Sequence, residues 1–161
     1  MQYETFEPCY DMMSCDLPVL MIEDEESDAI LVQRALCKEQ INNLVRVVPD
    51  GVEAVKYMRG EGIYQDRSEY PLPGVILIDM KLPRKNGLEV LEWLRHYPES
   101  CAIPIIILSG SQEANEITKA YQMGANAFMA KPTSFNDLRK LLRVTYDFWS
   151  LCEKPLSLSQ V

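Results

Sequence analysis

Short apolar runs alternate with stretches of helical periodicity along most of the chain. Runs with the length and composition of buried strands lie at Leu20 to Ile22, Leu44 to Val48, Val75 to Ile78, Ile103 to Leu108 and Ala127 to Ala130. After each run, apolar residues recur three or four positions apart, as on one face of a helix. Apolar strands that alternate with helices are typical of a parallel sheet covered on both faces. We therefore predict an α/β, flavodoxin-like, doubly wound fold with a five-stranded parallel sheet of order 2-1-3-4-5 and helices on both faces.

Polar residues mark the starts of the predicted helices. Those placed to cap a helix are Asp50, Asn86 and Ser111, and the last helix is expected to start near Ser134. The first two are followed three positions later by a glutamate, which is the spacing of a capping box. The predicted helices cover 51–59, begin at 86, cover 112–123 and run from 134 to 152. Residues 60–74 hold glycine, proline, tyrosine and charges without an apolar period, so we expect an ordered surface loop there.

The last predicted helix is longer than the sheet requires. A helix from Ser134 to Cys152 measures roughly 28 Å at a rise of 1.5 Å per residue. Its apolar stripe is typical of core packing and comprises Leu138, Leu141, Leu142, Thr145, Phe148, Trp149 and Cys152. We expect Phe148 and Trp149 to lie beyond the core and to form a homodimer interface through this helix.

Length and composition fit one folded domain. The chain has 161 residues, and we predict an N-terminal arm over 1–17, a folded domain over 18–152 and a C-terminal tail over 153–161. The five cysteines are an odd number without a close-spaced pair, so we expect reduced thiols rather than a zinc site or a disulfide framework.

The charge balance argues against two classes of partner. The net charge is −8, and no cluster of Lys and Arg suits a nucleic acid or an anionic lipid surface. No apolar run approaches the roughly 18 residues that a membrane span needs, and the acidic N-terminus does not resemble a signal peptide. We expect a cytoplasmic protein that binds neither nucleic acid nor membrane.

The carboxyl ends of the predicted strands carry the candidate chemistry. The residues there are all polar, namely Glu23, Asp24, Asp79, Ser109 and Lys131. In a doubly wound sheet these strand ends meet at one ligand crevice. Carboxylates brought together repel, by about 4 kcal/mol for a pair 4 Å apart at an effective dielectric constant near 20. A hard divalent cation such as Mg²⁺ is therefore expected among the carboxylates.

One carboxylate of this set is placed to be a nucleophile. Asp79 follows the predicted central strand, where it can face the metal, the Ser109 hydroxyl and the Lys131 ammonium together. A metal-neutralised aspartate can attack phosphorus and form an acyl phosphate. Ser109 and Lys131 would then stabilise the phosphoryl oxygens.

The combined motifs resemble the receiver domains of two-component response regulators. They are Ile22-Glu23-Asp24, Ile78-Asp79-Met80 with Pro83 and Gly87, Leu108-Ser109-Gly110, Gly124-Ala125, and Phe128 with Lys131-Pro132. The long segment before the third strand and the closing Phe148-Trp149 resemble a narrower group, the stand-alone receivers that partner cyanobacterial-type phytochrome histidine kinases. The resemblance covers about Pro18 to Phe148.

This resemblance implies a mechanism and a partner. The metal ligands would be Asp24, Asp79 and the Met80 carbonyl, with Glu23 reaching the ion directly or through water. A cis peptide bond would precede Pro132. Phosphorylation would move Ser109 and turn Phe128 inward, which changes the surface for partner binding or phosphorelay. The partner would be a sensor histidine kinase, and the protein would catalyse only its own phosphorylation and dephosphorylation.

Other interpretations compete with this one. A lone strand-end aspartate is more often a cap or a turn residue, and the single histidine, His96, is expected at the surface. A phosphohydrolase of the haloacid-dehalogenase kind also uses a strand-end aspartate, but it needs a second aspartate where Lys81 stands. A pseudo-receiver, which binds a partner without being phosphorylated, would lack some of the acceptor, metal and switch residues that are present here. A flavin module would need a phosphate-binding loop where Glu25 and Glu26 stand.

Overall fold

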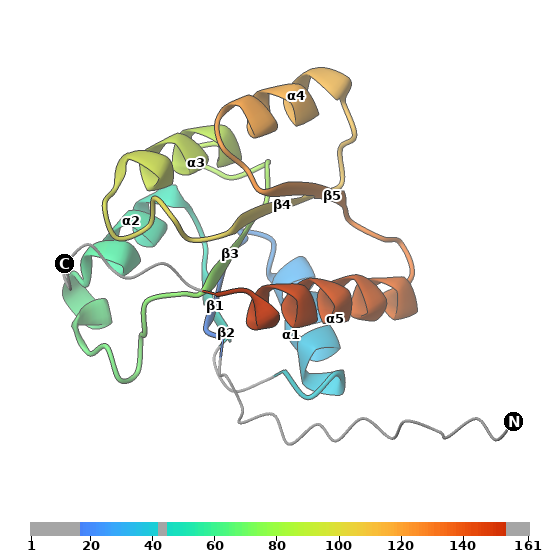
Figure 1. Ribbon diagram of the computed structural model, residues 1–161, viewed down its shortest axis with the longest axis horizontal. Coiled ribbons are helices and arrows are strands. Elements are labelled where there is room, and N and C mark those ends of the chain that lie inside the picture. The colour runs from blue at the N-terminus through green and yellow to red at the C-terminus, as the bar shows by residue number, and fades with distance from the viewer. Residues whose placement is uncertain (1–16, 42–44, 154–161) are drawn as a thin grey trace, which may run out of the picture.

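The computed structural model describes residues 17–41 and 45–153 (Figure 1). The strands are β1 (Val19–Ile22), β2 (Val45–Val48), β3 (Val75–Ile78), β4 (Ile105–Ser109) and β5 (Ala127–Ala130). The helices are α1 (Glu26–Lys38), α2 (Gly51–Arg59), the short 3-10 helix η1 (Gly62–Gln65), α3 (Gly87–His96), α4 (Ala114–Gln122) and α5 (Phe135–Leu151). All strand pairs are parallel and the sheet order is β2-β1-β3-β4-β5, which confirms the predicted doubly wound topology.

Helices cover both faces of the sheet (Figure 1). Alternate strand residues such as Leu20, Ile22 and Ile76 pack with α2, α3 and α4 in one core cluster. Their neighbours in sequence, such as Met21 and Leu77, pack with α1 and α5 in the other. Because successive side chains of a strand point to opposite faces, a strand that is buried on both sides is apolar throughout. The β1 and β3 sequences VLMI and VILI are buried at every position.

Two of the predicted helix caps are confirmed and one is wrong, and Ser134, the predicted start of the last helix, is also a cap. Asp50, Asn86 and Ser134 each accept a hydrogen bond from the backbone N–H three residues later. Ser111 does not cap α4, which begins at Ala114 after Glu113. The N–H of Ser111 donates to Oγ of Ser109 instead, so Ser111 belongs to the turn that leaves β4.

The predicted surface loop over 60–74 is ordered by specific contacts. It contains η1 and is anchored by Arg67, whose guanidinium donates to the carbonyls of Tyr57, Met58 and Tyr70. The rings of Tyr57, Tyr64 and Tyr70 pack against one another with centroids 5.1 to 6.1 Å apart. This aromatic cluster attaches the loop to α2.

Helix α5 buries one side and exposes another. Leu138, Leu142 and Thr145 are buried, and Trp149 packs partly buried against the core that α1 shares. Phe148 is 58% exposed and packs edge-on against Trp149. The expectation that both aromatics lie beyond the core therefore holds for Phe148 alone, because Trp149 faces the sheet.

The ends of the chain and the cysteines bear on the remaining predictions. Leu17, the last residue of the predicted arm, is buried, and its N–H donates to the Tyr146 hydroxyl. The rest of that arm and most of the tail lie outside the described residues.

Cys37, Cys101 and Cys152 are free thiols, whereas Cys9 and Cys15 fall outside the described part. No helix within 17–41 and 45–153 is long and apolar enough to cross a membrane.

Candidate functional site

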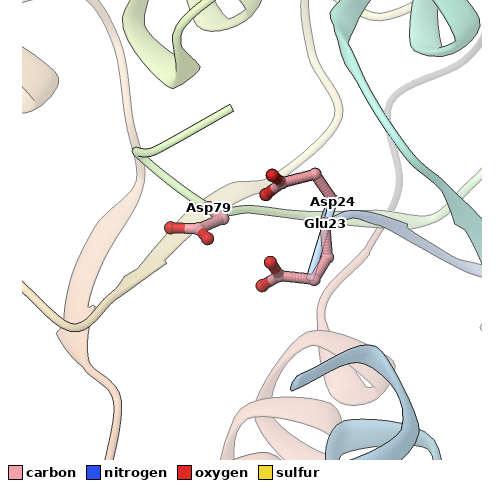
Figure 2. Close-up of side chains that lie close together, drawn as sticks. All are labelled: Glu23, Asp24 and Asp79. Carbon is pink, nitrogen blue, oxygen red and sulfur yellow. The ribbon is translucent and has the colours of Figure 1, made fainter. Parts of the chain in front are cut away.

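Three carboxylates meet at the carboxyl ends of β1 and β3 (Figure 2). Glu23 and Asp24 follow β1 directly, and Asp79 follows β3, which pairs with β1 in parallel register. One oxygen from each of the three side chains lies within 4.8 Å of the other two. Parallel pairing at one sheet edge thus brings together residues more than fifty positions apart, as the sequence predicts.

The geometry and chemistry of this cluster fit a hard divalent cation. Two oxygens that bind the same Mg²⁺ lie at most about 4 Å apart, because each Mg–O distance is about 2.0–2.1 Å. The carboxylates, within 4.8 Å of one another, need only a small inward adjustment to share one ion. Glu23 is buried, Asp79 is half-buried and Asp24 is exposed, so the cluster opens to solvent on the Asp24 side.

Lys131 enters the same cluster from β5. Its Nζ lies 2.8 Å from Oε2 of Glu23 and 3.4 Å from Oδ2 of Asp79. The Lys131 N–H donates to the Ser109 carbonyl, which continues the pairing of β4 and β5 and directs the side chain toward β3. The side chain of Lys131 is only 18% exposed, so its charge is screened less than that of a surface lysine.

A fourth carboxylate, which the sequence analysis did not select, also binds Lys131. Oδ2 of Asp28, in the first turn of α1, lies 2.8 Å from Nζ. An acidic residue there is also the ordinary preference of a helix N-terminus, so its type alone does not distinguish it. Its contact with Lys131 depends on how α1 is rotated against the sheet, which the local sequence does not indicate.

The contacts of the site shift the ionisation of Glu23 and Lys131. Burial raises the pKa of Glu23 to about 7, although the hydrogen bond and the charge of Lys131 act in the opposite direction. For Lys131, burial disfavours the ammonium, but hydrogen bonds from Nζ to Asp28 and Glu23 outweigh it and raise the pKa above its usual value. Lys131 is therefore charged at neutral pH, and it compensates part of the repulsion among the carboxylates.

Asp79 is held by the backbone on both sides. Its N–H donates to the Ile22 carbonyl, and its Oδ1 accepts from the N–H of Lys81 at 3.2 Å. The Met80 carbonyl accepts from the N–H of Gly87 at 3.1 Å, which leaves it a second lone pair. A Cβ at Gly87 would lie 2.6 Å from the Asp79 carbonyl oxygen, so only glycine lets α3 begin this close to the end of β3.

The two predicted switch residues lie on neighbouring strands. Ser109 is buried at the end of β4, and its Oγ accepts from the N–H of Ser111 at 3.2 Å. Phe128 is half-buried in β5 opposite Ile107 and packs against the core on the α3 and α4 side. Its N–H donates to the hydroxyl of Tyr121 on α4. This hydrogen bond, which the sequence analysis missed, joins α4 to the edge of the sheet.

Two other expectations have clear outcomes. The cis peptide bond implied before Pro132 is wrong, because the described residues contain no cis peptide bond. The trans form is the intrinsically preferred isomer even before proline, and Lys131 reaches Glu23 and Asp79 from it. His96 is exposed at the end of α3, as expected, and its Nδ1 contacts the Glu92 carbonyl.

Comparisons with known proteins agree with this geometry. The family model of the response regulator receiver domain matches residues 19–143. Response regulator Rcp1 of Synechocystis sp. is 30% identical over 131 residues, which are 81% of this chain and 87% of Rcp1. The crystal structure of the phosphorylated cyanobacterial phytochrome response regulator RcpA is 32% identical, with a TM-score of 0.77 over 86% of this chain and 98% of RcpA. The Mn(2+)-bound form of Rcp1 is 28% identical, with a TM-score of 0.75 over 86% of this chain and 99% of that one.

Proposed function

The chain belongs to the response regulator receiver family, whose members are phosphorylated by histidine kinases, and we propose that Asp79 is its phosphoacceptor. One observation carries the assignment. The Asp79 carboxylate follows the central strand β3, with the Glu23 and Asp24 carboxylates on one side and the Lys131 ammonium 3.4 Å from Oδ2. Among the described residues, this is the aspartate that faces both a candidate metal site and a lysine at the sheet edge.

The transfer needs little more than placement and charge. A carboxylate oxygen of Asp79 attacks the phosphorus of a phosphohistidine, an O–P bond forms as the P–N bond breaks, and the imidazole leaves with a proton. Negative charge on the phosphoryl oxygens is stabilised by the Lys131 ammonium and by the Ser109 hydroxyl once that side chain turns toward them. In the structure the Ser109 Oγ instead accepts from Ser111.

Receiver domains bind a divalent metal in this acidic pocket, and we assign the ion here as Mg²⁺. The ligands would be the carboxylates of Asp24 and Asp79 and the Met80 carbonyl, with Glu23 bound directly or through water. Bound Mg²⁺ would neutralise charge on Asp79 and on the incoming phosphoryl oxygens. Oxygen donors of this type also suit Mn²⁺, with which relative Rcp1 has been crystallised.

The output follows from the placement of Ser109 and Phe128. When Ser109 turns from Ser111 toward the phosphoryl group, the Phe128 side chain rotates into the space that Ser109 vacates. The backbone N–H of Phe128 donates to the Tyr121 hydroxyl, so α4 is attached to the strand whose side chain turns. The α4 and β5 surface would then change, so the protein acts as a regulator rather than as an enzyme with turnover on a substrate.

A phytochrome histidine kinase is the kinase that the comparisons favour. Relative RcpA is described as a cyanobacterial phytochrome response regulator, and it aligns over 98% of its length with this chain. Incubation with a phosphorylated phytochrome kinase and Mg²⁺, followed by intact-mass measurement, should show one added phosphoryl group. No transfer from that kinase, with transfer from an unrelated one, would refute the phytochrome assignment and leave the acceptor assignment standing.

We also propose that two copies of the chain associate through α5. Val144, Phe148 and Leu151 are 68%, 58% and 65% exposed and follow one another at spacings of four and three along the helix. They form one apolar stripe on the side of α5 that faces away from the sheet. A second copy would bury this stripe against its own.

Light scattering tests this association. The wild type should be dimeric at high micromolar concentration, whereas Phe148→Ser should be largely monomeric. Ile63→Ser, which removes another exposed apolar side chain in η1, should remain dimeric. A monomeric wild type, both phosphorylated and unphosphorylated, would refute the α5 interface.

A further inference from the structure

We propose that Asp28 is a positioning residue that restrains Lys131 in the unphosphorylated protein and competes with the phosphoryl group for its ammonium. The inference rests on the proposed function of Asp79. It concerns a carboxylate that is not among the predicted metal ligands or switch residues. Asp28 would act only through Lys131.

The hydrogen bonds of Lys131 are fully assigned in the structure. An ammonium group has three N–H donors. Nζ of Lys131 lies 2.8 Å from Glu23, 2.8 Å from Asp28 and 3.4 Å from Asp79. The longest of the three contacts is the one to the proposed acceptor, so the lysine is held mainly by the other two carboxylates.

Phosphorylation changes the demand on this ammonium. A phosphoryl group brings three strong acceptor oxygens and carries a charge of about −1.5 to −2, in place of the single negative charge of the free Asp79 carboxylate. For Lys131 to donate fully to them, its Nζ must move toward Asp79, and one of its two short contacts has to lengthen or break.

Burial decides which contact is released. The side chain of Glu23 is fully buried, so bulk water cannot replace the lysine as its partner when that contact lengthens. The side chain of Asp28 is 40% exposed, so water can replace the lysine there. The ion pair with Asp28 is therefore the one that opens. The free energy needed to break it lowers the affinity of the site for a phosphoryl group.

The test uses beryllofluoride, a phosphoryl mimic, with Mg²⁺ and the full chain. Asp28→Asn removes the ionic contact while it keeps the size and an acceptor oxygen at the helix N-terminus. The matched control is Glu26→Gln, which removes one charge in the same first turn from an exposed residue without a contact to Lys131. Fluorine NMR of the bound mimic gives the affinity of each variant, and thermal melting confirms that each is folded.

Asp28→Asn should bind beryllofluoride about fivefold more tightly than Glu26→Gln, which corresponds to a partly exposed ion pair. In a Lys131→Met background, where the restraint has no target, Asp28→Asn and Glu26→Gln should bind equally. Equal affinity of the two single variants, weaker binding by Asp28→Asn, or a gain that persists without Lys131 would each overturn the inference. Failure of the wild type itself to bind the mimic would overturn the proposed function as well, so the two failures are distinguishable.

Discussion

Nζ of Lys131 lies 2.8 Å from Oε2 of the buried Glu23, across the edge of the sheet. The two residues are 108 positions apart in the sequence, and the parallel order of the strands brings them together. This ion pair places a positive charge inside the acidic cluster in the absence of metal. It therefore offsets part of the repulsion among the carboxylates, and it sets the position from which Lys131 would move toward a phosphoryl group.

Replacing Lys131 with Arg should separate phosphate uptake from switching. The charge remains, but a planar fork replaces a compact ammonium and cannot occupy the position between Glu23 and Asp79 in the same way. We expect the rate of phosphorylation to stay within about tenfold of the wild-type rate. This corresponds to a change of at most about 1.4 kcal/mol in activation free energy. Intact mass measures uptake, and hydrogen exchange of α4 and β5 measures switching. Loss of uptake with normal switching in the beryllofluoride complex would contradict this role.

Neutralising Asp24 should have opposite effects with and without metal. Without Mg²⁺, Asp24→Asn removes repulsion from Glu23 and Asp79 and should raise the free energy of unfolding. The gain should be about 1 kcal/mol or less, because Asp24 is exposed and Lys131 already compensates its neighbours. Mg²⁺ at a hundredfold excess over its Kd should stabilise the wild type by about 2.7 kcal/mol, and the variant much less.

Chemical unfolding with and without Mg²⁺ measures both effects of this substitution. Glu25→Gln, at the exposed neighbouring position, is the matched control and should keep the full response to Mg²⁺. If Asp24→Asn lowers stability without metal and leaves the Mg²⁺ response intact, Asp24 is an ordinary helix-start residue and the metal site is misassigned.

The contact between Glu53 and Tyr64 should make stability depend on pH at the acid end. Oε1 of Glu53 accepts from Lys56 and Oε2 accepts from the Tyr64 hydroxyl, both at 2.8 Å. The Lys56 hydrogen bond, and then that of Tyr64, hold the pKa of Glu53 below 4.5. A lowered native pKa gives stability that is present above the pKa of the unfolded chain and is lost as the pH falls through the native one.

Tyr64→Phe should therefore destabilise the protein at pH about 7, by about 1 kcal/mol, and the difference from the wild type should shrink near pH about 3. Urea unfolding at the two pH values measures this change. Tyr70→Phe, which alters the same aromatic cluster without a hydrogen bond to Glu53, is the control. A Tyr64→Phe penalty that is equal at both pH values would show that the hydroxyl contributes only packing or a neutral hydrogen bond.

The sequence predicted the features of the fold that depend on local pattern. The predicted strands at Val75–Ile78 and Ala127–Ala130, the caps Asp50 and Asn86 and the helix start near Ser134 match the structure, because apolar runs and capping residues leave signals within a few residues. The prediction that Ser111 caps a helix was wrong because a serine near a helix start can equally well belong to the preceding turn. There the N–H of Ser111 donates to Oγ of Ser109. Nothing in the local sequence distinguishes these two roles.

The candidate site was predictable where topology alone brings residues together. Glu23, Asp24, Asp79, Ser109 and Lys131 all lie at or just after the carboxyl end of a strand, so the parallel sheet order places them at one edge. Asp28 and Tyr121 were missed because each acts through a side chain whose direction depends on how a helix is rotated against the sheet. The trans peptide before Pro132 was missed because the cis form was inferred from resemblance rather than from the residues themselves.

The assignment of Asp79 as acceptor is tested most directly by labelling the wild type, Asp79→Asn and Asp147→Asn with the same phosphorylated kinase and Mg²⁺. Asp147 is a carboxylate on α5 that pairs with Arg143 and makes no ion pair with a residue of the cluster, and so controls for loss of an aspartate. Intact mass should show one base-labile phosphoryl group on the wild type and on Asp147→Asn, and none on a folded Asp79→Asn. Full labelling of Asp79→Asn would contradict the account.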